Sequence, residues 1–128
     1  QSSGTAQVVA LAYLSSGRFS GSLATVRALY QARHDALQKS LVAAGFDAPA
    51  VTGGMFLWAR LPEHIDPVRL FEATVARGAL YAPGEAFAAC SQVNDITHYA
   101  RFCFASNSLE KISEATNRLA DAVRLSTT

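Results

Sequence analysis

Residues 97–107 read THYARFCFASN, and the alternation of side chains in this stretch decides the fold class. Successive side chains of a β-strand point to opposite faces of the sheet. The two phenylalanines of ARFCF therefore share one face, and Tyr99, Arg101 and Cys103 share the other. The phenylalanine face suits a cover of helices. We predict a strand over residues 98–105 that is buried on one face and carries a cation in the middle of the other.

The segments around this strand alternate between helical and extended patterns, which predicts an α+β layer structure. Helical spacing of apolar residues marks four segments, and alternation or a Pro-Gly turn marks two further strands. The expected helices are residues 3–17, 21–45, 66–78 and 107–124, and the other expected strands are 53–62 and 79–84. We expect a small sheet of three or four mainly antiparallel strands with helices packed on one face. A long connecting helix precedes it, and residues 85–94 form a loop or a short helix.

Capping residues support the helix boundaries. Ser22 is expected to cap the long helix, and Gly45 to end it. Asp66 and the proline that follows it predict the start of the third helix, and Ser108 predicts the start of the last one.

Composition excludes several classes of protein. The chain has 128 residues, of which 50% are hydrophobic and 16% charged, with a formal net charge of +1. This is the composition of a globular domain. A nucleic-acid-binding domain would carry clustered basic residues, and none are clustered here. The longest apolar stretch near the start, AQVVALAYL, is too short to span a bilayer. We expect neither a nucleic-acid partner nor a membrane.

The cysteines and histidines do not form a metal or redox motif. Cys90 and Cys103 fit neither a CxxC motif nor a zinc site, and no histidine pair has the spacing of metal ligands. We expect two reduced thiols in a cytoplasmic protein and no metal.

Residue patterns alone leave two interpretations of Arg101 open. Its face of the strand could meet solvent, with the aliphatic stem lying along the sheet. Alternatively, Arg101 could present its planar guanidinium to a carboxylate or phosphate, because arginine stays charged and binds two oxygens at once.

Four stretches in this order carry a resemblance to a known family: LYQARHDALQKSL, GGMFLWARLP, LFEATVARGALYAPGEAF and ARFCFASNSLEKISEATNRLADAV. Together they resemble the C-terminal portion of class I/II, fold-type I, pyridoxal-phosphate-dependent aminotransferases. Within this family, the four stretches resemble the branch of the 2-aminoadipate and kynurenine aminotransferases. The resemblance covers nearly the whole chain.

This resemblance implies a substrate site on the strand. The family's arginine on the late strand binds the α-carboxylate of the substrate, and Arg101 occupies the matching position. Gly53 and Gly54 would line the wall of the cleft, although a plain tight turn explains them equally well. Pro83 and Gly84 would shape the same pocket.

Two aromatic residues are not expected to take part in catalysis. Tyr81 and Trp58 are expected to be core or wall residues and not catalytic groups.

The same resemblance implies that the cofactor is held elsewhere. Pyridoxal phosphate needs a lysine to bind covalently, and neither Lys39 nor Lys111 resembles the family's cofactor lysine, which precedes this region. We therefore expect no catalytic or cofactor-binding residue in this chain and interpret it as a fragment. Residues 1–45 would form an N-terminal helix and the connecting helix, and residues 46–128 the small domain.

The full-length enzyme would transfer an amino group from an amino acid to a 2-oxo acid. Its expected partners are these substrates, the large cofactor-binding domain of the same protein and a second subunit in a homodimer. Two alternatives stay open. The chain could be the effector-sensing domain of a helix-turn-helix transcription regulator, or a stand-alone α+β ligand-binding domain.

Overall fold

The computed structural model describes residues 3–88 and 96–126, and the chain divides into two compact units, Gln1–Gln31 and Ala32–Thr128. We call them unit 1 and unit 2. The expected boundary between residues 45 and 46 stays a prediction.

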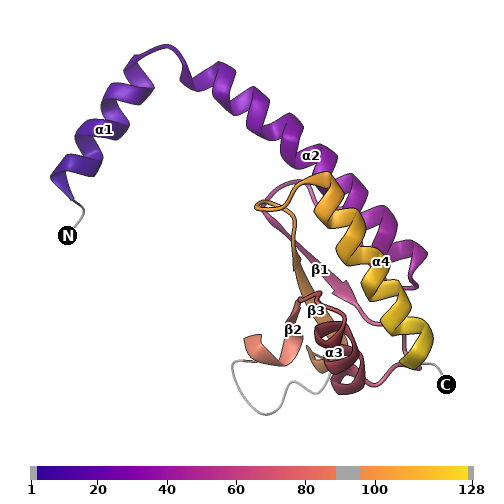
Figure 1. Cartoon of the computed structure of the whole chain (residues 1–128). Coiled ribbons are helices and arrows are strands. Elements are labelled where there is room, and N and C mark those ends of the chain that lie inside the picture. Colours follow the sequence, from indigo (N-terminus) through magenta and orange to yellow (C-terminus); the bar gives the residue numbers. More distant parts are fainter. Residues whose placement is uncertain (1–2, 89–95, 127–128) are drawn as a thin grey trace. The chain divides into compact units, whose positions relative to one another are not determined.

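Unit 1 contains helix α1 (Gly4–Ser15) and the first part of helix α2 (Phe19–Ala43), which continues into unit 2 (Figure 1). Gly17 separates the two helices with a φ of +73°, a left-handed conformation that glycine adopts without strain. No residue of α1 is buried, and Val8 and Leu11 expose 68% and 66% of their surface. The apolar residues of this helix therefore lack a cover within the unit.

Unit 2 is built on a three-stranded sheet of strands β1 (Phe56–Arg60), β2 (Ala82–Pro83) and β3 (Tyr99–Cys103). The strand order is β1-β3-β2, and both neighbours pair antiparallel to β3. This confirms the predicted antiparallel sheet. The central strand is shorter than expected, because a 3-10 turn, η2 (Ile96–His98), precedes it.

One face of the sheet forms the core of unit 2. Leu57 and Ala59 of β1 and Ala100 and Phe102 of β3 are buried on it. The second part of α2, helix α3 (Pro67–Ala76) and helix α4 (Leu109–Ser126) supply its cover, and α3 packs against α4 (Figure 1). Aromatic contacts connect the layers. They are the pairs Phe46–Phe102, Tyr81–Phe102 and Phe71–Tyr81, with ring centroids 5.3 to 5.7 Å apart.

The predicted caps of α3 and α4 are confirmed. Oδ1 of Asp66 accepts hydrogen bonds from the backbone N–H groups of Val68 and Arg69, both at 2.9 Å. Oγ of Ser108 accepts from the N–H of Lys111 at 3.4 Å. A hydrogen bond with the Ser108 side chain, together with a backbone hydrogen bond, lowers the pKa of Glu110 in the first turn of α4.

The predicted start of α2 is wrong at its first turn. The helix begins at Phe19, and the N–H of Ser22 already donates to the carbonyl of Arg18 at 3.0 Å. Ser22 is therefore inside the helix and does not cap it. The predicted end is confirmed, because Gly45 follows the last turn with a φ of +91°.

None of the helices in the described residues is long and apolar enough to cross a membrane. The described residues also contain no group of three or more His, Cys, Asp or Glu side chains that could hold a metal ion.

Candidate functional site

The candidate site lies on the face of the sheet opposite the helices. Arg101 is at the centre of β3, the central strand, with Trp58 opposite it on β1 and Ala82 opposite it on β2. Its neighbours in β3 alternate in burial: Ala100 and Phe102 are buried, whereas Arg101 is half-buried. The structure therefore agrees with the predicted alternation and places the cation on the face opposite α2, α3 and α4. We call this surface the open face.

Aromatic rings surround the guanidinium group. The guanidinium carbon of Arg101 lies 4.2 Å from the ring centroid of Phe56 and 4.5 Å from that of Phe87. Trp58 stacks on Tyr99 and contacts Phe87 edge-on, and in both pairs the ring centroids are 5.6 Å apart. A cation above an aromatic face is attracted by the ring quadrupole. These contacts restrict the position of the guanidinium, and its N–H groups, which lie in the guanidinium plane, point away from the ring faces, as binding of a planar anion requires.

Arg101 has no charged partner among the residues that the structure describes. No hydrogen bond or ion pair joins its guanidinium to residues 3–88 or 96–126. By contrast, Arg118 is paired with Glu114, and Arg124 with Asp121. A half-buried guanidinium without a counter-charge in the described part of the chain is suited to bind an anion, and its fork matches the two oxygens of a carboxylate.

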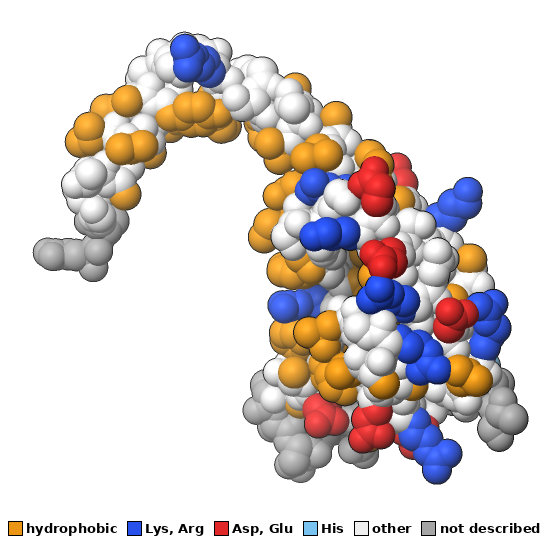
Figure 2. All heavy atoms as spheres, in the orientation of Figure 1, with side chains coloured by type: hydrophobic (Ala, Val, Ile, Leu, Met, Phe, Trp, Pro, Cys, Tyr) orange, Lys and Arg blue, Asp and Glu red, His pale blue; other side chains and the backbone are white. Residues whose placement is uncertain are grey.

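The surroundings of Arg101 are apolar and partly exposed. Phe56 and Phe87 expose 37% and 40% of their surface, and Met55 at the entrance of β1 exposes 46%. Figure 2 shows hydrophobic side chains, with basic ones between them, along the edge of unit 2 that lies away from α4. Apolar walls around one charge are typical of a ligand site, because they lower the local dielectric and strengthen ionic contacts.

The two predicted pairs, Gly53–Gly54 and Pro83–Gly84, lie on different sides of Arg101. Gly53 and Gly54 precede β1, near the strand end that pairs with Cys103, and both are exposed. Gly54 has a φ of +96°, so its turn favours glycine, whereas Gly53 has open space where a Cβ would lie. Their role as a wall of the cleft stays a prediction.

Pro83 and Gly84 lie beside the central strand. Pro83 pairs with Ala100, and Gly84 begins the 3-10 helix η1 (Gly84–Phe87), which ends with a ring over Arg101. Gly84 is buried, and a Cβ there would lie 2.0 Å from the carbonyl oxygen of Ile96. The absence of a side chain at Gly84 thus has a packing reason, and its contact with substrate stays a prediction.

The two expected non-catalytic aromatics have different positions. Tyr81 is buried in the core against Phe71 and Phe102, and burial raises the pKa of its phenol. Trp58 is half-buried on the open face, as a wall residue.

Sequence reasoning missed the two phenylalanines that contact Arg101. Alternation along β1 already set Phe56 on the same face as Trp58, so Phe56 could have been found. Phe87 gave no such signal, because it belongs to a short 3-10 helix and not to a strand. Of the two cysteines that we expect to be reduced, Cys103 is an exposed free thiol, and Cys90 lies outside the described residues.

The described residues do not fit a site for pyridoxal phosphate. Lys39 on α2 and Lys111 on α4 are both exposed, and both helices lie on the side of the sheet opposite Arg101. Neither lysine is therefore placed beside the open face, and no other lysine occurs in the sequence.

Comparisons with known proteins identify relatives over most of the chain. The family model of aminotransferase class I and II matches residues 1–119. The aromatic-amino-acid aminotransferase 1 of Thermococcus litoralis is 36% identical over 121 residues, which cover 92% of this chain and 28% of that protein.

Solved structures agree with the sequence match. A crystal structure of kynurenine aminotransferase from Pyrococcus horikoshii in complex with PMP has a TM-score of 0.81 at 32% identity, covering 95% of this chain and 30% of that one. The α-aminoadipate aminotransferase LysN from Thermus thermophilus, complexed with N-(5'-phosphopyridoxyl)-L-leucine, has a TM-score of 0.74 at 26% identity, covering 89% and 29%. The chain thus spans under a third of the length of these relatives.

Proposed function

Because this chain belongs to the class I and II aminotransferase family, we propose that it forms the C-terminal small domain of a pyridoxal-phosphate-dependent aminotransferase. The full-length enzyme transfers an amino group from an amino acid to a 2-oxo acid. The single observation that supports this proposal within the chain is Arg101, whose guanidinium lies among aromatic rings on the open face and has no charged partner in residues 3–88 and 96–126.

Arg101 binds the α-carboxylate of the amino acid. Two parallel N–H···O hydrogen bonds fix both the position and the plane of the carboxylate. Fixing that plane fixes the direction of the bonds at the α-carbon, which is the atom that reacts. The contribution of this chain to catalysis is therefore positioning and electrostatic complementarity, not proton transfer.

Aromatic side chains next to Arg101 favour an amino acid with an aromatic or apolar side chain. Phe56, Trp58 and Phe87 provide ring faces and edges on the open face, and rings stack well on other rings. Two relatives, named for aromatic amino acids and for kynurenine, support the same substrate class.

We expect the purified full-length protein, supplied with pyridoxal phosphate, to form glutamate from 2-oxoglutarate and an aromatic amino acid. Glutamate is measured by a coupled assay across the twenty common amino acids. If no amino acid yields glutamate above the control without enzyme, the aminotransferase proposal is wrong for this protein.

Pyridoxal phosphate supplies the electron sink for this chemistry and is held by residues outside this chain. Homodimerisation and a cytoplasmic location belong to the same proposal. The exposed apolar residues of α1 support an interface with another domain or subunit, because large apolar surfaces usually pack against another surface. We infer that the large domain or the second subunit covers them.

The isolated chain should form no specific covalent adduct with pyridoxal phosphate. Both lysines are exposed on helices that lie on the side of the sheet opposite Arg101, so neither is oriented toward a cofactor bound at the open face. The test is borohydride reduction in the presence of pyridoxal phosphate, followed by digestion and mass spectrometry. A stoichiometric adduct on Lys39 or Lys111, resistant to dilution, would contradict the assignment of the cofactor site to the missing domain.

A further inference from the structure

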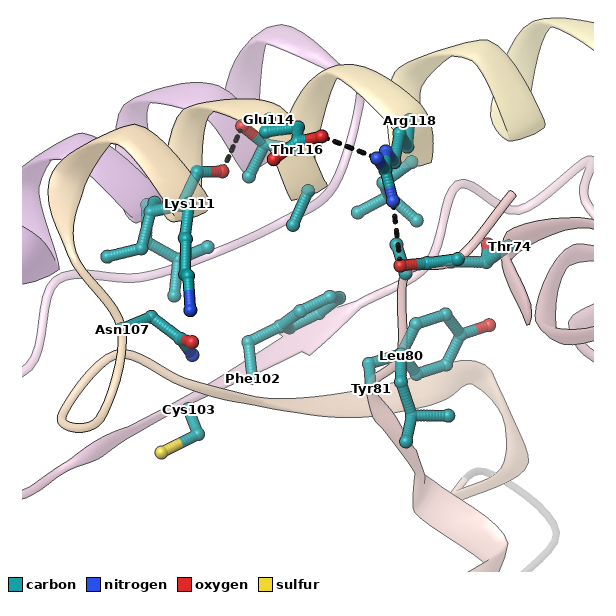
Figure 3. Close-up of a pocket in the computed structure, with 16 residues that line it drawn as sticks. Thr74, Leu80, Tyr81, Phe102, Cys103, Asn107, Lys111, Glu114, Thr116 and Arg118 are labelled. Carbon is teal, nitrogen blue, oxygen red and sulfur yellow. Dashed lines mark hydrogen bonds and ion pairs between the residues drawn. The ribbon is translucent and has the colours of Figure 1, made fainter. Parts of the chain in front are cut away.

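A cavity of about 310 Å³ lies on the helix-covered side of the sheet, within unit 2. Its lining comes from α2, α4, the end of α3, the segment leading to β2, and β3 (Figure 3). Phe102 lines the cavity, and as the neighbour of Arg101 in β3 it points to the opposite face of the sheet. The buried part of the lining therefore lies on the helix-covered side of the sheet; Arg101 is not among the lining residues, whereas Cys103 of β3 also borders the cavity.

The floor of the cavity is apolar. Leu37, Phe102, Ile112 and Leu119 line it, and each exposes at most 7% of its surface. A volume of this size lies at the lower end of the range for small-molecule sites. The cavity can take an apolar body of about one ring or a branched chain, whose burial would be favourable.

Only one end of the cavity carries an uncompensated charge. Arg118 lines one side, but its guanidinium is held by Glu114 and by the carbonyl oxygen of Gly78 at 3.0 Å. Lys111 lines the other side, and its side chain extends from α4 toward Asn107 (Figure 3). No hydrogen bond or ion pair of the Lys111 ammonium is found within residues 3–88 and 96–126. An apolar floor with a free ammonium and an amide at one end matches a carboxylate with an apolar body.

We propose that this cavity is a second ligand site, which binds a small apolar monocarboxylate. The apolar body lies on the leucines and on Phe102, and the carboxylate accepts hydrogen bonds from Nζ of Lys111 and from the side-chain amide of Asn107. The site is independent of Arg101 and of the aminotransferase reaction.

The test is calorimetric titration of the full-length protein with phenylacetate. An Arg101→Ala background removes the competing carboxylate site, and the wild-type background is titrated in parallel in case that variant does not fold. Saturable binding is expected, and Lys111→Met should weaken it by at least about tenfold, because the apolar stem is kept and the charged hydrogen bond is lost.

Two matched controls identify the site. Lys39→Met removes the other lysine of the sequence, which is exposed on α2 outside the cavity lining, and should leave the affinity unchanged. The alcohol 2-phenylethanol has a similar apolar body without the charge and should bind much more weakly. The proposal is overturned if phenylacetate binding is not saturable, if Lys111→Met binds as tightly as Lys39→Met, or if the alcohol binds equally well.

Discussion

Replacing Arg101 by Ala in the full-length enzyme should lower kcat/KM for the amino acid by about 30-fold to several thousand-fold. The guanidinium is the one charge that we assign to the substrate carboxylate, and it lies among aromatic rings at 4.2 and 4.5 Å. Without it, the carboxylate would be held in an apolar site without a counter-charge. Steady-state kinetics with the best amino-acid substrate measures the effect.

Arg101→Lys should also impair turnover strongly, and it tests the geometry and not only the charge. A lysine keeps one positive charge but loses the planar pair of donors, so the carboxylate is no longer fixed in one plane. Both variants should bind pyridoxal phosphate nearly as the wild type does, which the absorbance of the bound cofactor reports.

A substrate without a carboxylate provides the control. The slow reaction of an amine that lacks the α-carboxylate should be almost indifferent to either substitution. Equal losses for the amine and the amino acid would show that Arg101 maintains the structure of the domain and does not bind the carboxylate.

The parts of the fold that local chemistry determines could be predicted from the sequence. The carboxylate of Asp66 accepts hydrogen bonds from two N–H groups at the start of α3, and the proline at the first helical position has no N–H that needs an acceptor. The sequence of residues 66–69 therefore predicts the start of this helix. The faces of β3 followed from strict alternation, and that alternation set Arg101 apart from the core.

The predicted start of α2 was wrong, because more than one residue near it could begin a helix. Ser22 has the side chain of a good cap, but α2 begins at Phe19, and Phe19 contacts Tyr13 edge-on with ring centroids 6.2 Å apart. A cap residue marks a possible helix start, and nothing in the serine itself excludes an earlier one.

The candidate site could be predicted only in part, because its walls come from distant segments. Phe56 and Arg101 are neighbours through strand pairing between β1 and β3. Phe87 reaches Arg101 through the 3-10 helix η1, whose first residue, Gly84, lies close against the backbone of Ile96. Alternation along β1 indicates the face of Phe56 but not its strand partner, and Phe87 has no local sequence signal at all, whereas Arg101 is recognisable as a cation within an apolar strand.

The close approach of Gly84 to the backbone of Ile96 predicts a large effect of the substitution Gly84→Ala. A Cβ on Gly84 would lie 2.0 Å from the carbonyl oxygen of Ile96 and 2.8 Å from that of Tyr99. Both atoms belong to the backbone, so no side-chain rotation can relieve the overlap, and the chain itself must shift. Gly84→Ala should therefore destabilise the protein by about 1–3 kcal/mol or more, as overpacking in a buried site does.

The same shift should reach the proposed substrate site, because η1 begins at Gly84 and ends at Phe87, whose ring centroid lies 4.5 Å from the guanidinium carbon of Arg101. We expect Gly84→Ala to raise KM for the amino acid in addition to lowering the unfolding temperature of the full-length enzyme. Gly53→Ala is the matched control, since nothing lies within 4 Å of a Cβ there and Gly53 is not among the positive-φ glycines. It should unfold close to the wild-type temperature. If Gly84→Ala were as stable as Gly53→Ala and kept the wild-type KM, the close contact at Gly84 would not constrain η1, and Phe87 would have to be held over Arg101 by its own packing against Trp58 alone.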